Sequence, residues 1–432
     1  MKIPRPHITQ PIRKAGKFWQ NLGPGFITGA ADDDPSGITT YAQSGAKFGF
    51  NFLWLAPYTF PLMALIQEMC AKIGMVTGRG LAGNIKKYYS KSFLIFITGL
   101  LFFANIFNIG ANLGAMAEAV KLIFPKLNFY LLTSAFVIIS LLLQIFSSYK
   151  TYSQILKWLA LFLLAYVFSA FYADLQIRDI FTKGFLPNDQ IFSKTGIILL
   201  CAFLGTTISP YLFFWQTSQE VEEEILEGKL TLKARQNPTL PSEIKKMQLD
   251  VWLGMFFSNL IAFFIIATTA SVLNQNGIYN IQSAAEAALA LKPLAGPWAA
   301  LLFSIGIVGT GMLAIPVLAG SCSYALSETF GWKNGLYKTL KQAKAFYATL
   351  ILAMVLGFCM NLIGLNPIKA LIFSAIINGL VAPFILIPIV QISSNQKIMN
   401  TFANGRLKQN LGWLIIGLMF VVGAFSLISF LL

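Results

Sequence analysis

GAADDDPSG, residues 29–37, places three consecutive carboxylates and a proline inside an otherwise apolar segment, residues 23–47. A charge near the bilayer centre costs about 2.5–3.5 kcal/mol on insertion scales, so an uninterrupted lipid-facing helix would not hold three. Residues 23–31 are too short to span a membrane alone, and residues 38–50 continue as a second apolar half. We therefore predict a transmembrane helix broken at Pro35; the alternative is an external loop.

GTTISPY, residues 205–211, interrupts a later apolar helix in the same way. Its proline, Pro210, follows Pro35 by 175 residues (210 minus 35). Gly/Pro interruptions at corresponding places in two halves of a chain indicate a transporter built from inverted repeats, with its site where the unwound segments meet. We therefore expect helices one and six to be broken and to enclose the site.

The composition excludes a soluble enzyme. Of the 432 residues, 56% are hydrophobic and only 11% are charged, whereas soluble domains are about one quarter charged. The net charge of +15 sits in short gaps between apolar blocks, so we expect no nucleic-acid partner but contact with the lipid bilayer. We predict an all-α polytopic membrane protein with eleven spans. The spans are 23–47, 51–73, 92–124, 129–148, 153–173, 196–219, 247–274, 296–327, 345–364, 367–392 and 410–432.

The spans divide into two predicted repeats of five helices. Residues 23–173 form the first repeat and residues 196–392 the second, with residues 410–432 as an additional eleventh helix and residues 1–22 as a tail. With the tail in the cytoplasm, 24 of the 32 Lys and Arg residues lie on that side, which leaves 8 outside. This bias obeys the positive-inside rule. We expect an integral protein of a bacterial plasma membrane, with the N-terminus cytoplasmic and the C-terminus outside.

The two breaks supply a set of oxygen ligands. Unwinding frees backbone carbonyls, and together with a carboxylate these suit a small cation. Asp34, adjacent to the first proline, is the first candidate for the anionic ligand. Nearby hydroxyls would coordinate the cation, bind its retained water, or merely cap the broken helices. These are Ser36, Thr206, Thr207 and Ser209.

Three stretches resemble the Nramp family of proton-coupled divalent transition-metal transporters, which have the LeuT-type fold. They are GPGFITGAADDDPSGITTYAQSGAKFGFNFLWL, LIQEMCAKIGMVTGRGL and LLCAFLGTTISPYLFFWQTSQEV. Asp34-Pro35-Ser36-Gly37 stands where the family has Asp-Pro-Gly-Asn, and Ser209-Pro210-Tyr211 stands where it has Met-Pro-His. The resemblance implies a metal site at Asp34, Gly37, Ser209 and the carbonyl of Thr206.

The chain departs from the family pattern in its ligands. Gly37 replaces the Asn and Ser209 replaces the Met, so the soft sulfur ligand is missing. Sulfur discriminates softer transition ions from magnesium or calcium, so we expect a Mg²⁺ or Mn²⁺ class of substrate.

The proton-linked residues of the family also differ. Tyr211 and Gln216 stand where the family has histidines, and the acids of its helix three are replaced near Asn112. Proton coupling is therefore not expected. Asp32 and Asp33 are extra carboxylates, which either take up a proton or second cation or line an aqueous vestibule.

The favoured function is a secondary transporter that moves a divalent cation by alternating access. The alternatives are a LeuT-fold transporter of another small solute or anion, and a non-transporting sensor or scaffold. No nucleotide-binding GxxxxGK[ST] motif is present, so we expect no ATP-driven transport, no enzymatic activity and no cofactor. The sequence carries no signal for an oligomeric state. The charged stretch from Glu220 to Lys246 is expected to be a solvated linker.

Overall fold

The computed structural model describes residues 23–146, 160–173, 177–236 and 240–431, together with positions 151, 154, 155, 158 and 175. The predicted tail, residues 1–22, lies outside these residues. The described residues form helices and connecting turns and contain no β-strand. The α-helices are α2 (Pro24–Asp32), α3 (Pro35–Phe48), α4 (Leu55–Thr77), α5 (Leu81–Tyr88), α6 (Lys91–Lys121), α7 (Phe129–Phe146), α9 (Leu164–Tyr172), α10 (Ile177–Lys183), α11 (Lys194–Thr207), α12 (Pro210–Leu226), α13 (Leu232–Arg235), α14 (Pro241–Val272), α15 (Ala284–Ala288), α16 (Lys292–Ala295), α17 (Ala299–Phe330), α18 (Lys344–Met360), α19 (Pro367–Ser393), α20 (Gln396–Met399) and α21 (Arg406–Leu431).

Short 3-10 helices connect or extend the α-helices. They are η1 (Gly49–Phe52), η2 (Ala160–Leu163), η3 (Asp189–Phe192), η4 (Asn274–Asn276), η5 (Leu289–Leu291), η6 (Gly296–Trp298), η7 (Asn361–Ile363) and η8 (Asn400–Phe402).

The helices confirm the all-α polytopic prediction. In the described part of the chain, nine helical segments are long and apolar enough to cross a membrane. The broken pair α2 and α3 occupies the predicted first span, 23–47. Helices η2 and α9 occupy the described part of the predicted fifth span, 153–173. Neither of these two segments is among the nine, and the bent pair of α9 and α10 makes a tenth candidate if it is counted as one span.

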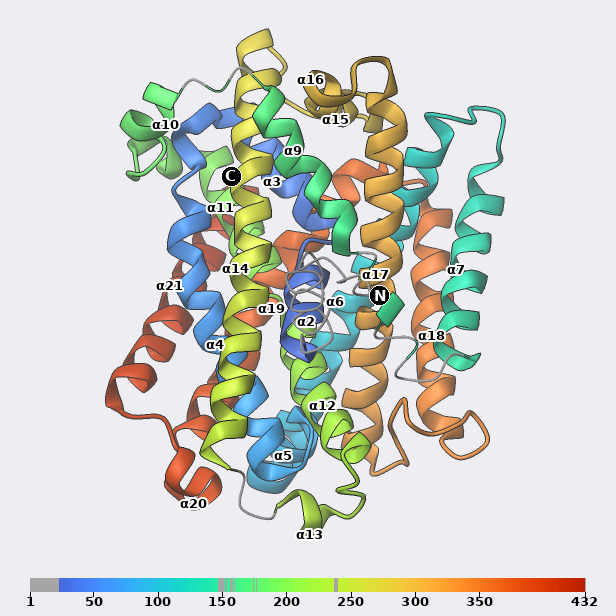
Figure 1. Cartoon of the computed structure of the whole chain (residues 1–432), viewed down its shortest axis with the longest axis vertical. Coiled ribbons are helices and arrows are strands. Elements are labelled where there is room, and N and C mark those ends of the chain that lie inside the picture. Colours follow the sequence, from blue (N-terminus) through green and yellow to red (C-terminus); the bar gives the residue numbers. More distant parts are fainter. Residues whose placement is uncertain are drawn as a thin grey trace, which may run out of the picture.

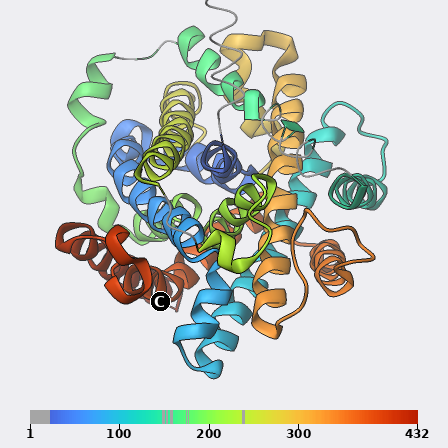
Figure 2. The same cartoon turned by 60° about the horizontal axis from the view of Figure 1, so that its bottom comes forward.

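The first broken span runs through the middle of the bundle. Figures 1 and 2 show α2 and α3 enclosed by the longer helices. Helix α2 packs against α12 and α14, whereas α3 packs against α11, α14 and α19. This arrangement buries the polar stretch inside the protein and away from lipid. At membrane depth, unwound backbone is tolerated only when protein or a water-filled cavity surrounds it.

Both predicted breaks are present, each directly before a proline. Helix α2 ends at Asp32 and α3 begins at Pro35, while α11 ends at Thr207 and α12 begins at Pro210. Proline suits the first position of a helix, because its missing N–H would have had no intrahelical acceptor there. The two prolines therefore start new half-helices instead of kinking continuous ones.

Glycines let the broken helices approach their neighbours closely. A Cβ atom on Gly29 of α2 would overlap the backbone of Gly254 in α14. A Cβ atom on Gly205 of α11 would overlap the backbone of Gly379 in α19. Helix backbones in contact at these points fix both breaks against the rest of the bundle.

The expectation of a solvated linker after Glu220 is wrong for its first part. Helix α12 continues to Leu226, and Glu220, Glu222 and Glu224 are only 6%, 2% and 3% exposed. Their carboxylates are hydrogen-bonded inside the protein, for example Glu222 to the Tyr324 hydroxyl of α17 at 2.6 Å. The charged residues in this stretch therefore include buried, hydrogen-bonded acids as well as solvent-exposed side chains.

Replacing Gly205 by Val should destabilise the protein. The added atoms have no space beside Gly379, and overpacking of this kind costs about 1–3 kcal/mol or more. Thermal unfolding in detergent should show a lower Tm. Gly99→Ala in α6 is the matched control, because a Cβ atom there meets nothing within 4 Å. An unchanged Tm for Gly205→Val would contradict the close packing of α11 on α19.

Candidate functional site

Asp34 lies at the first break, where its side chain caps the amino end of α3. One carboxylate oxygen accepts hydrogen bonds from the Ser36 hydroxyl at 2.7 Å and from the Gly37 backbone N–H at 2.8 Å. The other oxygen accepts from the side-chain amide of Asn112 in α6 at 2.9 Å. Asp34 is 1% exposed, so these donors, and not bulk water, stabilise the carboxylate.

Asn112 joins α6 to the first break and keeps one polar atom unused. Its amide nitrogen binds Asp34, but its Oδ1 is buried without a hydrogen-bond partner in the described part of the chain. Leaving a buried acceptor unsatisfied costs about 1–3 kcal/mol. This oxygen is therefore available to a cation or to a water molecule that the cation retains.

At the second break, two of the candidate hydroxyls bind the carboxyl end of α11. The Thr207 hydroxyl donates to the carbonyl of Phe203 at 2.7 Å. The Ser209 hydroxyl lies 2.6 Å from the carbonyl of Thr206 and 2.9 Å from that of Gly205. In this conformation both hydroxyls serve the helix end, as the capping alternative describes, and the Thr206 carbonyl already has a donor.

The two breaks touch each other. A Cβ atom on Gly37 would lie 3.0 Å from the Thr206 hydroxyl and 3.0 Å from the carbonyl of Asp32. The Tyr211 hydroxyl of α12 donates to the carbonyl of Ala31 in α2 at 2.8 Å. The absence of a side chain at Gly37 and the phenol of Tyr211 therefore bring the half-helices of both spans together.

Asp32 and Asp33 share a single hydroxyl on α14. The Ser258 oxygen lies 3.0 Å from one oxygen of Asp32 and 3.3 Å from one oxygen of Asp33. A hydroxyl has one proton, so it satisfies only one carboxylate at a time. The other oxygen of each aspartate is buried with no partner among the described residues.

The three aspartates do not form a single cage. Within the described ranges, no three His, Cys, Asp or Glu side chains gather in a way that would hold a metal ion. Asp32 and Asp33 face Ser258 on α14, whereas Asp34 faces Asn112 on α6. A cation at this site would consequently be held by one or two carboxylates together with neutral oxygens.

Gln216 does not lie with the other candidate residues. It is on α12, and its side-chain amide donates to the carboxylate of Glu220, one turn further along the same helix, at 2.7 Å. Tyr211, by contrast, contacts the first break directly. The structure therefore brings together Asp34, Ser36, Gly37, Asn112, Thr206 and Tyr211 but leaves Gln216 with Glu220.

Sequence reasoning missed Ser258 and Asp250, both on α14. The Asp250 carboxylate accepts from the backbone N–H groups of Gly23 and Gly25, each at 2.7 Å, and so caps the start of α2 from another helix. Helix α2 has no side-chain cap of its own. These contacts join residues more than 220 positions apart, and no local motif marks them.

The chain matches the family described as "Natural resistance-associated macrophage protein-like" over residues 25–429. It belongs to the Nramp family. Its relatives include a divalent metal cation transporter, MntH, of Erwinia tasmaniensis, which is 25% identical over 94% of each chain. A protein of the same name from Klebsiella pneumoniae is 25% identical over 95% of this chain and 94% of the relative. These relatives are named as transporters and not as enzymes, and a divalent cation is their substrate and not a cofactor.

Solved structures show the same fold. The manganese transporter of Eremococcus coleocola superposes with a TM-score of 0.73 at 17% identity, over 99% of this chain and 88% of that one. The transporter Mhp1 superposes with a TM-score of 0.56 at 16% identity, over 94% of this chain and 89% of that one. The predicted Nramp membership and LeuT-type fold are therefore confirmed.

Replacing Ser258 by Ala should lower the stability of the metal-free protein. Asp32 and Asp33 would both lose their hydroxyl donor, which costs about 1–3 kcal/mol for a buried group. The measurement is the Tm in chelator-treated detergent solution. Ser323→Ala on α17 is the control, because that hydroxyl binds only the carbonyl of Ala319 in its own helix. Equal Tm values for the two variants would argue against the shared hydroxyl.

Proposed function

We propose that this Nramp-family chain is a secondary transporter that moves a divalent cation of the Mg²⁺ or Mn²⁺ class by alternating access. The observation that carries the proposal is the buried Asp34 carboxylate at the contact between two broken helices. The MntH relatives, named divalent metal cation transporters, support the same substrate class.

The ligands available at the breaks are hard oxygen donors. They are the Asp34 carboxylate, the Ser36 and Thr206 hydroxyls and the free Oδ1 of Asn112. Oxygen sets of this kind suit Mg²⁺, Mn²⁺ and Ca²⁺, whereas a thioether favours softer ions. Asn112 supplies from α6 an amide group that the family pattern would place at Gly37. A rearrangement of Ser209 would free the Thr206 carbonyl as a further ligand.

The closed surroundings of the site support alternating access. Asp34, Gly37 and Thr206 are all buried, so bulk water reaches the breaks from neither side in this conformation. The start of α2 is held against α14 by Asp250. Transport would require α2 and the neighbouring half-helices to separate from α14 on one side at a time.

We further propose that metal uptake is not coupled to protons. The only histidine of the chain is His7 in the tail, and Tyr211 and Gln216 stand at the family's histidine positions. Asp32 and Asp33 are fully buried, and we assign them to charge compensation of the bound cation or of a second cation. Their burial fits this role better than the vestibule alternative in the present conformation.

The proposed setting is a bacterial plasma membrane with the N-terminus in the cytoplasm and the C-terminus outside. The charge bias of 24 against 8 basic residues and the bacterial relatives support this placement. The repeat boundaries, 23–173 and 196–392 with 410–432 added, belong to the same proposal.

Flux into proteoliposomes tests the function directly. We expect uptake of Mg²⁺ or Mn²⁺, and Asp34→Ala should reduce it more than about tenfold because the anionic ligand is lost. Asp179→Ala is the control, because Asp179 lies in an exposed ion pair with Lys183.

The same assay separates the alternatives. A pH gradient should not change metal uptake, and the lumen should not acidify. Acidification with uptake would contradict the proposed lack of proton coupling. Bicarbonate transport that persists in Asp34→Ala would favour the anion alternative, and no flux of any tested ion would favour a sensor or scaffold.

Ser209→Met should shift the ion preference. The variant restores a thioether beside the second break, so the ratio of Mn²⁺ to Mg²⁺ uptake should rise severalfold. Ser209→Ala is the control, because it also removes the hydroxyl that binds the Thr206 carbonyl but adds no sulfur. A similar ratio in both variants would place Ser209 away from the transported ion.

A further inference from the structure

A cavity lies away from the breaks, on the face that carries α5 and α13 at the bottom of Figure 1. Its volume is about 450 Å³, within the range of small-molecule sites. The turn after α4, helix α5, the last turns of α12, helix α13 and the end of α17 with its following loop line it. No part of the proposed transport mechanism uses this cavity.

Four cationic side chains line the cavity: Arg79, Lys86, Lys87 and Arg235. None of them forms an ion pair within 4.0 Å with a carboxylate of the described residues. The Lys86 ammonium donates to a backbone carbonyl at 3.3 Å, and that of Lys87 lies 5.0 Å from the centre of the Tyr88 ring. The Nε of Arg79 is buried without a hydrogen-bond partner among the residues that the structure describes.

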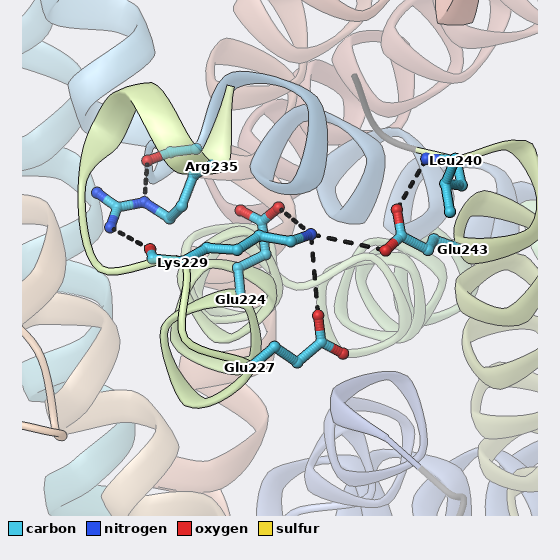
Figure 3. Close-up of polar contacts among 7 residues, drawn as sticks. Glu224, Glu227, Lys229, Arg235, Leu240 and Glu243 are labelled. Carbon is cyan, nitrogen blue, oxygen red and sulfur yellow. Dashed lines mark hydrogen bonds and ion pairs between the residues drawn. The ribbon is translucent and has the colours of Figure 1, made fainter. Parts of the chain in front are cut away.

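Figure 3 compares two neighbouring cations: Lys229, which has carboxylates within ion-pair distance, and Arg235, for which none of the described residues supplies one. Among the described residues, the Arg235 guanidinium donates only to carbonyl oxygens, those of Gly78, Lys229 and Leu230. The neighbouring Lys229 ammonium lies between the carboxylates of Glu224, Glu227 and Glu243, at 3.3, 3.8 and 3.6 Å. Lys229 thus has three carboxylates within 4.0 Å, whereas no described carboxylate lies that close to the Arg235 guanidinium, which interacts with Glu224 only at longer range.

The two carboxylates in the cavity wall are already occupied. Glu328 accepts from the backbone N–H groups of Gly80 and Gly83, each at 2.8 Å, and so holds the start of α5. Glu222 accepts from the Tyr324 hydroxyl at 2.6 Å and from the N–H of Leu336 at 2.8 Å. Both acids fix the walls of the cavity through these bonds. The charge of Arg79 acts on Glu328, but neither acid forms an ion pair within 4.0 Å with any of the four cations.

We propose that this cavity binds a phosphate-bearing anion. Arg and Lys together recognise phosphate, since guanidinium groups bind it bidentately and ammonium groups act as point charges. The volume exceeds that of a single simple ion, and the cavity opens at the membrane surface that the charge bias assigns to the cytoplasm. The phosphate is the headgroup of an anionic lipid or part of a soluble compound.

Occupation of the cavity would connect two parts of the fold. Helix α12 begins at the second break and reaches the cavity at Ser218, about 12 Å further along its axis. The opposite wall is formed by α5 and α17. An anion held by the four cations would join the turn before α5 and α5 itself, which carry Arg79, Lys86 and Lys87, to α13, which carries Arg235, independently of the transported ion.

The test is direct binding to the purified full-length protein in detergent, measured by calorimetry and by the shift of Tm. The soluble probes are inorganic pyrophosphate and ATP. The lipid probes are short-chain phosphatidylglycerol and, as the neutral-headgroup comparison, short-chain phosphatidylcholine. We expect at least one anionic probe to bind. The triple variant Arg79→Gln, Lys86→Gln and Lys87→Gln should weaken the affinity for that probe at least tenfold.

The matched control removes three charges from the same face but outside the cavity: Lys333→Gln, Lys341→Gln and Lys344→Gln. It should weaken binding less than twofold. Binding of the soluble probes alone identifies a soluble ligand, and binding of phosphatidylglycerol alone identifies a lipid. If the triple variant does not fold, Arg79→Gln alone should still weaken binding severalfold. The proposal is overturned by no binding up to about 1 mM, by equal binding of phosphatidylcholine and phosphatidylglycerol, or by equal losses in the cavity and control variants.

Discussion

The Asp34 carboxylate is the group on which the centre of this protein depends. A helix that starts inside a membrane exposes backbone N–H groups that no water satisfies, and Asp34 accepts one of them from Gly37. The same carboxylate needs donors of its own and receives them from Ser36 and Asn112. The break and the Asp34 carboxylate thus stabilise each other, because the helix start and the buried carboxylate satisfy one another's hydrogen bonds.

The three adjacent acids differ in how well they are satisfied. Asp34 has three donors, whereas Asp32 and Asp33 compete for the hydroxyl of Ser258. In the absence of a cation, the carboxylate oxygens that lack hydrogen bonds within the described part of the chain therefore belong to Asp32 and Asp33, which face α14, and not to Asp34, which faces α6. A positive ion that approaches from α14 would meet the less satisfied carboxylates first.

The sequence predicted the features that local chemistry determines. The prolines at positions 35 and 210 set both breaks, and uninterrupted apolar stretches set the remaining spans. It did not predict which residues meet in space. The pairs Asp250 with Gly23 and Ser258 with Asp32 come from helices distant in the chain, and their partners are backbone groups or single hydroxyls without a pattern.

The family pattern places Gln216 at the site, but the side chain lies one turn away from it along α12 and donates to Glu220. Glu222 at the end of α12 resembles part of a solvent-exposed run, because its partners lie on α17 and in the loop that follows α17.

The cap that Asp250 of α14 places on the start of α2 makes the hydrogen bonding of one helix depend on its contact with the other. Helix α2 has no side-chain cap of its own, and Asp250 accepts the hydrogen bonds of its first N–H groups. These groups therefore have their acceptor only while α2 packs against α14. Under the proposed alternating access, separation of the two helices would let water hydrate the Gly23 and Gly25 N–H groups and the Asp250 carboxylate together, so the lost hydrogen bonds would be replaced. The contact between α2 and α14 is consequently stable while water is excluded from it, and water that enters at one end lowers the cost of separating the two helices.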